Sequence, residues 1–407
     1  MLRLVNNEIQ YNYDHCQQCG ACSAVCPKGA ISLHPLDNGL KDVVVDSNVC
    51  IRCQRCVKVC PANRNVSVSN DRDDYQDIFP KKQFFLAWNA DNEIRHLSSS
   101  GGATKTIIVE SLRSGFVDGV YSLRKLDEYP SAIGEFYTRE NRPSFDDLPN
   151  SVYHSIMACT EISKVQKVHR LMIVGTSCQL HALERSLKGK YDELVKVCIF
   201  CKQQKTLGST KWLGKVSGSK ISSNGGFTAE YRGIGWPGFV RVNGKPIAWE
   251  RAAGLPFGRR LWTVPGCNNC GDPFGIEVGA DICMMDPWKI RPENNLGETL
   301  VTVHTDVGLQ IMQKTKFLIA EEKTFSQVKD ALGLDDVWRK RVCASYFQGN
   351  NVSPEVERAA KADIAQRKFL EKLLTTLPRL PFICFRLLNK IVPKKRDAIL
   401  QYKDPFQ

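Results

Sequence analysis

The chain contains 17 cysteines in 407 residues, and the first eight have a spacing that suits iron-sulfur clusters. They form two runs of the pattern C-x2-C-x2-C-x3-C-P, which are Cys16, Cys19, Cys22 and Cys26, then Cys50, Cys53, Cys56 and Cys60. A 4Fe-4S cube needs four thiolates, and in two-cluster proteins the fourth cysteine of each run binds the other cube. The pattern therefore predicts one cluster on Cys16, Cys19, Cys22 and Cys60, and a second on Cys50, Cys53, Cys56 and Cys26. Zinc is the alternative, although structural zinc sites usually have separated C-x2-C pairs rather than close triplets.

A segment rich in serine and glycine, residues 98–104, lies between an expected strand and an expected helix. Backbone N–H groups at a helix N-terminus, together with small side chains and hydroxyls, suit a phosphate or pyrophosphate group. The candidate residues are Ser99, Ser100, Gly101, Gly102 and Thr104. The alternative is a serine N-cap followed by a flexible pair of glycines, and the motif alone does not decide between the two.

Four more cysteines fall at the ends of expected elements. Cys178 lies in the strand-to-helix turn of residues 174–179, Cys201 ends the next expected strand, and Cys267 and Cys270 share a loop. Such turns collect functional groups in parallel α/β sheets. The four thiols suit a third 4Fe-4S cube or a zinc ion. Cys178 and Cys201 are equally well explained as small core residues, because free cysteine is commonly buried.

The remaining pattern predicts the elements that position these residues. Alternating or continuous apolar runs indicate strands, and apolar residues at helical spacing indicate helices. We expect strands at 30–33, 43–45, 84–88, 117–123, 171–174 and 194–200, and helices at 104–113, 152–168 and 180–187. A hairpin turn is expected at Asn243-Gly244. The alternation of strands and helices favours a largely parallel sheet with covering helices.

Changes in composition divide the chain into four parts. Residues 1–70 are expected to form an α+β bacterial-type ferredoxin domain with two 4Fe-4S clusters, and residues 71–82 a linker. Residues 83–300 are expected to form an α/β domain with a mixed sheet, and residues 301–407 a helical carboxy-terminal region.

Charge and cysteine usage restrict the function classes. The formal net charge is +13, but the basic residues are scattered and accompany no recognition motif, so we expect no nucleic-acid partner. Clustered cysteines without a secretory signal favour a cytoplasmic protein. Residues 369–396 combine apolar and basic side chains, and Pro378 and Pro381 exclude a membrane span there. A helix packed on the protein or on a partner is favoured over peripheral contact with an anionic membrane.

Taken together, these residues resemble the family of beta subunits of coenzyme F420 hydrogenases and dehydrogenases. The resemblance extends over residues 16–290 and rests on the double cysteine motif and on short segments in a fixed order. These segments are 99–102, 115–120, 151–153, 174–179, 200–201, 267–270 and 280–282. The chain departs from the family at Ser177, at Lys202-Gln203 and at Met285, where members commonly have proline, a His-Gly pair and glycine.

The resemblance implies further cofactors and the residues that hold them. It implies a flavin-binding α/β domain, with FAD held by Ser99, Ser100, Gly101, Gly102, Thr104, Gly175, Thr176 and Gln179. It also implies that the third site is a 4Fe-4S cluster on Cys178, Cys201, Cys267 and Cys270, with Cys283 as a reserve ligand. The thiols interpreted as non-ligands are Cys159, Cys198, Cys343 and Cys384.

The implied function is that of an iron-sulfur flavoprotein oxidoreductase. Electrons would move between the 4Fe-4S clusters and FAD, to reduce or oxidise an organic substrate or a deazaflavin-like coenzyme. The expected partners are a small-molecule substrate and a ferredoxin-like protein or redox enzyme that donates or accepts electrons. Tyr153, Lys202 and His181 are candidates for proton transfer, each better explained as structural. The alternative is a non-catalytic electron-transfer subunit of a partner enzyme, since some similar proteins accompany polysaccharide-synthesis enzymes.

Overall fold

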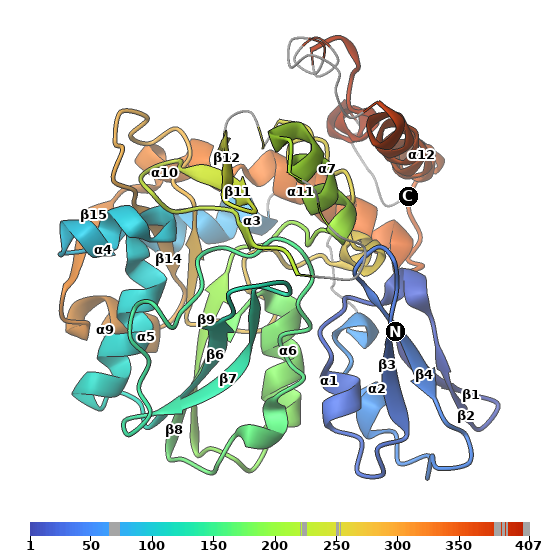
Figure 1. The fold of residues 1–407 in the computed structure, drawn as a ribbon, viewed down its shortest axis with the longest axis horizontal. Helices are drawn as coiled ribbons and strands as arrows, with labels where there is room; N and C mark the ends of the chain where they lie inside the picture. The colour runs from blue at the N-terminus through green and yellow to red at the C-terminus, as the bar shows by residue number, and fades with distance from the viewer. Residues whose placement is uncertain are drawn as a thin grey trace.

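The computed structural model describes residues 1–64, 74–219, 221, 226–249, 252, 254–377, 384, 387 and 390–401 of the chain. A small cysteine-rich module at the amino end lies beside a larger α/β domain, and the long helix α12 (Pro354–Thr376) projects at one end of the molecule (Figure 1). Among the helices of these described residues, none is long and apolar enough to cross a membrane.

The amino-terminal module contains two antiparallel strand pairs and two short helices. The elements are β1 (Leu2–Val5) with β2 (Glu8–Tyr11), β3 (Ile31–Pro35) with β4 (Lys41–Val45), α1 (Ala21–Ala24) and α2 (Arg55–Val59). The strands predicted at 30–33 and 43–45 correspond to β3 and β4. The fully buried apolar core is limited to Leu2, Ile31, Val43 and Cys56. So small a core is typical of modules that a metal centre holds together.

Eight strands form the central sheet of the larger domain. They are β5 (Gln83–Asn89), β6 (Gly119–Lys125), β7 (Ala132–Thr138), β8 (Arg170–Gly175), β9 (Glu193–Ile199), β13 (Ile282–Met285), β14 (Thr299–Val303) and β15 (Leu318–Lys323). Their order across the sheet is β15-β5-β14-β13-β9-β8-β6-β7. The pairs among β6, β8, β9 and β13 are parallel and the other pairs are antiparallel, which confirms the predicted mixed sheet. The strands predicted from 84 to 200 correspond to β5, β6, β8 and β9.

Helices cover both faces of this sheet because their apolar residues match its two buried surfaces. One apolar cluster includes residues of α5 (Ala103–Ser114) and α9 (Asp306–Lys314), and the other includes residues of α6 (Ser177–Ser186) and α10 (Phe325–Leu332). A smaller sheet of β10 (Ala229–Glu230), β11 (Phe239–Val242) and β12 (Lys245–Ala248) contacts α7 (Leu207–Ser217). The β11-β12 turn falls at the predicted Asn243-Gly244. The helices predicted at 104–113 and 180–187 correspond to α5 and α6.

The helix predicted at residues 152–168 is wrong. This segment is irregular up to the short 3-10 helix η5 (Ile162–Lys164). Its backbone bonds to distant segments instead: Lys205 N donates to Tyr153 O (2.8 Å), and Cys159 N donates to Cys19 O (2.8 Å). These bonds use groups that a helix would pair internally, so tertiary contacts override the apolar spacing.

Two expected boundaries also differ from the structure. Residues 71–73 of the predicted linker lie outside the described residues, but α3 (Asp74–Ile78) and η3 (Phe79–Lys81) do not form a linker, because Phe79 is buried in the main core. In the region predicted to be helical from 301 onward, β14 and β15 belong to the central sheet. Helices follow only from α10, through α11 (Leu334–Phe347) to α12. The predicted basic segment 369–396 falls partly outside the described residues.

Candidate iron-sulfur sites and adjoining loops

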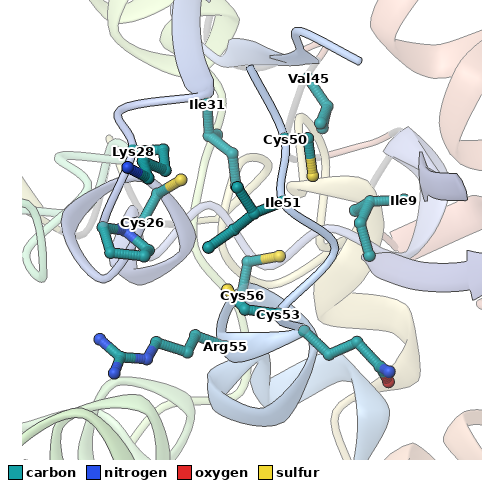
Figure 2. Close-up of a pocket in the computed structure, with 12 residues that line it drawn as sticks. Ile9, Cys26, Lys28, Ile31, Val45, Cys50, Ile51, Cys53, Arg55 and Cys56 are labelled. Carbon is teal, nitrogen blue, oxygen red and sulfur yellow. The ribbon is translucent and has the colours of Figure 1, made fainter. Parts of the chain in front are cut away.

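The second cysteine run surrounds one pocket together with the last cysteine of the first run. Cys26 lines this pocket with Cys50, Cys53 and Cys56 (Figure 2). Burial raises the pKa of Cys56 to about 11, and the charges of the neighbouring thiols add to the effect. Four thiolates in one small space repel one another, so a positive centre shared by all four would stabilise them.

The other cysteines of the first run lie near Cys60. Burial raises the pKa of Cys22, and the charges of Cys19, Cys16 and Cys60 raise it further, as expected for four neighbouring thiols. Gln18 N lies 3.4 Å from Cys16 Sγ, and N–H donors of this kind stabilise a thiolate. The structure thus places Cys60 with the first run and Cys26 with the second, while their role as cluster ligands stays a prediction.

A third pocket lies at the carboxyl ends of the parallel strands. Cys178, Cys201, Cys267 and Cys270 all line it. Cys178 lies in the first turn of α6, Cys201 follows β9 by two residues, and the other two lie in or directly after the 3-10 helix η6 (Pro265–Asn269). Burial raises the pKa of Cys201 to about 12, and its neighbours Cys267 and Cys270 contribute. The four thiols that the sequence singles out are therefore brought to one place.

The remaining described cysteines are mostly buried in apolar surroundings. Cys283, the reserve ligand of the sequence analysis, faces Cys198 across the β9-β13 pair, and both are fully buried. Cys159 is buried against Cys19, and Cys343 is buried on α11. Cys384 is partly exposed.

A buried lysine lies beside the third pocket. Lys340 on α11 is 3% exposed, and its Nζ donates to the Cys267 carbonyl oxygen at 2.8 Å. Burial lowers the pKa of Lys340, while nearby Cys270 and Cys267 raise it. A cation here would favour the added negative charge of a reduced cluster. The sequence analysis missed this residue, because one lysine in a helix rich in charged residues carries no signal of its own.

The first cysteine run and the third pocket touch through their backbones. A Cβ on Gly266 would lie 2.3 Å from the Cys16 carbonyl carbon, so this approach requires glycine. Gln17, the residue after Cys16, lines the third pocket. The residue that precedes Cys267 thus contacts a predicted ligand of the first cluster, and the two sites adjoin.

A buried ion pair fixes the same junction. Arg64 Nη2 lies 3.0 Å from Asp272 Oδ2, and the Asp272 side chain is 0% exposed. Ser177 Oγ donates to the same carboxylate oxygen at 2.6 Å. Arg64 belongs to the module, whereas Ser177 and Asp272 flank the thiols Cys178 and Cys270 of the third pocket. The serine that departs from the family pattern therefore serves as a donor to this carboxylate.

The serine-glycine segment forms the 3-10 helix η4 (Ser99–Gly102), between α4 (Asn92–Leu97) and α5. Ser100, Gly101 and Gly102 have positive φ angles of 48°, 75° and 75°. A Cβ on Gly101 would lie 2.6 Å from the Gly297 oxygen, so this position requires glycine. The left-handed turn leads directly into the N-terminus of α5, where backbone N–H groups and the helix dipole favour an anion.

Asp286 and Arg232 adjoin this loop, and the sequence analysis did not assign a role to either. Ser100 Oγ donates to Asp286 Oδ1 at 2.5 Å, and Asp286 Oδ2 lies 3.2 Å from Arg232 Nη2. Arg232 is 1% exposed, and its guanidinium lies 4.5 Å from the ring centroids of both Trp236 and Trp249. The Asp-x-Trp pattern at 286–288 is the signal that points to Asp286.

The other residues predicted to hold a flavin have partners within the protein. Thr176 and Gln179 form a capping box at the start of α6, in which Thr176 N donates to Gln179 Oε1 at 2.9 Å. Gly175 lies against the Gln179 side chain. Thr104 Oγ1 donates to Met284 Sδ at 3.5 Å. These side chains have a clear structural role at the ends of β8 and β13.

The three candidates for proton transfer also have structural surroundings. Lys202 Nζ forms an ion pair with Asp336 at 2.7 Å. Tyr153 packs on Phe257 with ring centroids 4.7 Å apart, and burial raises the pKa of Tyr153 to about 12. Burial lowers the pKa of His181 to about 3, so its ring is neutral at pH 7. The structural interpretation is therefore favoured for all three.

Two cysteine runs in a small α+β module, joined to a mixed-sheet domain with its own four-thiol pocket, define an iron-sulfur electron-transfer protein. Residues 15–64 match the 4Fe-4S dicluster domain, and residues 42–89 match a second family of the same description. Two further families describe the beta subunit of coenzyme F420 hydrogenase/dehydrogenase: residues 84–136 match its N-terminal part and residues 168–324 match its C-terminal part. The chain belongs to this family of beta subunits of coenzyme F420 hydrogenases and dehydrogenases.

Individual relatives match parts of the chain. A named subunit of the F(420)H(2) dehydrogenase of Methanosarcina mazei is 25% identical over 178 residues, which cover 42% of this chain and 48% of that protein. The chain thus spans about half the length of this curated relative. The polyferredoxin protein MvhB of Methanothermus fervidus is 42% identical over 53 residues, which cover 13% of this chain and 11% of that protein. A chain of the F420-reducing [NiFe] hydrogenase complex from Methanosarcina barkeri has a TM-score of 0.46 and 18% identity, covering 65% of this chain and 90% of its own.

Proposed function

We propose that the chain is an iron-sulfur flavoprotein oxidoreductase that moves electrons between 4Fe-4S clusters and FAD, to reduce or oxidise an organic substrate or a deazaflavin-like coenzyme. The contact between Gly266 and Cys16 carries this proposal, since a Cβ would come within 2.3 Å there. It brings the first cysteine run against the third pocket. Electron tunnelling falls steeply with distance, so adjoining sites of this kind are what a relay between clusters requires.

Each proposed cluster has four thiols around one small space. The sets are Cys16, Cys19, Cys22 and Cys60; Cys50, Cys53, Cys56 and Cys26; and Cys178, Cys201, Cys267 and Cys270. Within the described part of the chain, no group of three or more His, Cys, Asp or Glu side chains could hold a single metal ion. Thiols that enclose a pocket without converging on one point support a cube over zinc, whose sulfur ligands lie about 2.3 Å from the metal.

The serine-glycine loop is the proposed phosphate-binding part of an FAD site. Its backbone suits an anion, because residues 100–102 adopt left-handed conformations at the N-terminus of α5. Asp286 disfavours an anion beside Ser100, but the buried guanidinium of Arg232 offsets its charge. Gly175, Thr176 and Gln179 would contribute through their backbone. When bound, FAD would supply the interconversion of one-electron and two-electron transfer.

A separate redox protein is the proposed electron donor or acceptor, in the cytoplasm. The Methanosarcina mazei relative is named as one subunit of a dehydrogenase, which supports a protein partner. One observation favours the second candidate function, a non-catalytic electron-transfer subunit: Thr104, Thr176 and Gln179 already have protein partners. The flavin content distinguishes the two functions.

Anaerobic purification and reconstitution test the proposal directly. We expect about twelve irons and one FAD per chain. Cys26→Ser, Cys60→Ser and Cys201→Ser should each remove about four irons, from a different cluster in each case, as followed by iron content and EPR. Cys343→Ser, a buried thiol outside the three sets, is the matched control and should retain all of them. Zinc in place of iron would overturn the proposal, and full iron without flavin would favour the electron-transfer subunit.

A further inference from the structure

The two cysteine runs build the same loop twice. Gln18 and Arg52 lie two residues after the first cysteine of their runs and have φ angles of 56° and 57°. Gly20 and Gln54, two positions further on, also have positive φ angles, of 85° and 60°. Because the local backbone is alike, any difference in exposure between the two loops reflects what lies around them.

The loop of the first run faces the α/β domain. Gln17, Gln18 and Ala21 are 6%, 2% and 0% exposed. A Cβ on Gly20 would lie 2.7 Å from Thr160 Cγ2, so the loop is in close contact with the segment around that residue. No other protein has access to the first cluster site through this loop.

The loop of the second run, residues 49–55, faces solvent. Ile51 corresponds to Gln17 but is 56% exposed, and Val49 is 42% exposed. Cys53 is exposed, whereas the corresponding Cys19 is buried. Ile51 and Cys53 line the pocket of the second set of thiols (Figure 2). The second cluster site therefore lies at the surface of the molecule.

Basic side chains accompany this exposed loop. Arg52 and Arg55 are exposed on the loop itself. Lys28 is also exposed, and it lines the same pocket as Arg55 (Figure 2). An exposed apolar centre with a basic rim fits a partner that has an acidic rim around its own redox centre.

We propose that residues 49–55, together with Lys28, form the docking surface for a separate acidic iron-sulfur electron carrier. In each encounter one electron passes between the carrier and the second cluster, so that one is oxidised by one electron and the other is reduced by one. The first cluster, enclosed by the α/β domain, exchanges electrons with the rest of the chain. This inference rests on the proposed function, because it requires a cluster in the second set of thiols.

The test is the anaerobic rate of reduction of the full holoprotein by a reduced, acidic two-cluster bacterial ferredoxin, measured by stopped flow. Arg52→Glu should slow the second-order rate about tenfold at low ionic strength. The wild-type rate should fall as salt is added, and the variant should show a much weaker salt dependence. Lys316→Glu, an exposed basic residue just after α9 on the α/β domain, is the matched control and should change the rate less than twofold.

Two further measurements make every outcome decisive. Iron content and reduction by a viologen radical cation report whether the clusters are present in each protein. If they are present and Arg52→Glu stays within twofold of wild type, or Lys316→Glu slows the rate equally, the docking surface is wrong while the proposed function stands. If the wild type holds no clusters, the proposed function itself fails.

Discussion

Replacing Arg64 with methionine should loosen the amino-terminal module from the α/β domain. The Arg64 and Asp272 side chains are 15% and 0% exposed and lie 3.0 Å apart. Methionine keeps an apolar stem but leaves the Asp272 carboxylate buried, with donors only from Ser177 Oγ at 2.6 Å and Val278 N at 3.3 Å among the described contacts. Removing one partner of a buried ion pair typically destabilises by about 3–5 kcal/mol. We expect about 3 kcal/mol, the lower limit, because these two donors remain.

That energy corresponds to a roughly 150-fold rise in the population of the undocked module. The bond from Cys159 N to Cys19 O joins the two domains at 2.8 Å, so the exchange of this amide reports the undocking. Hydrogen exchange with mass spectrometry on the anaerobic holoprotein is therefore the assay. A peptide that contains Cys159 should exchange about a hundredfold faster in the variant when closing is fast.

Two comparisons separate the ion pair from general damage. Adding Asp272→Asn to Arg64→Met removes the buried charge and should recover at least half of the lost protection. Arg358→Met breaks an exposed pair with Glu355, whose side chains are 73% and 43% exposed, and should leave protection unchanged. Exchange in Arg64→Met within threefold of wild type would refute the reasoning.

Other substitutions test the third pocket, a buried histidine and the serine-glycine loop. Lys340→Met should lower the midpoint potential of the third cluster by on the order of 50–100 mV, for a charge roughly 8 Å away, and an unchanged EPR-monitored titration would contradict this. Burial lowers the pKa of His154 to about 4, so the unfolded chain binds a proton first and stability falls as pH drops below 6.5. His154→Gln should reduce this loss between pH 7 and 5 by about 2 kcal/mol in urea unfolding, and equal slopes would count against it. Gly101→Ala places a Cβ 2.6 Å from the Gly297 oxygen and should weaken FAD binding at least tenfold, whereas Gly189→Ala, at a similar φ of +83° with open space around it, should not.

Local chemistry explains why the cysteine sites could be predicted. Thiols two residues apart on one tight loop must lie together, so the triplet spacing of each run already determines most of a four-thiol set. Cys178 and Cys201 follow β8 and β9, which are parallel neighbours, and their separation is determined by the sheet. Sequence patterns of this kind carry over to structure because the positions depend on few contacts.

Long-range contacts explain what the sequence could not reveal. Residues 152–168 have helical spacing, yet their backbone bonds to Lys205 and Cys19, which are distant in sequence. Lys340 reaches the third pocket only because α11 packs on η6. Arg232 meets Asp286 by the same kind of tertiary placement. No periodicity within a single segment carries this information.

The unequal surroundings of the two cysteine loops are, in contrast, visible in the sequence once the loops are aligned. Gly20 permits the close approach to Thr160, whereas Gln54 at the equivalent position carries a long side chain that such a contact would exclude. Arg55 replaces Ala21, which is 0% exposed, and a charged side chain would be costly at that buried position. The repeat therefore differs at the residues that decide which loop can be enclosed. Comparing the two copies position by position predicts that the first cluster site faces inward and the second faces outward.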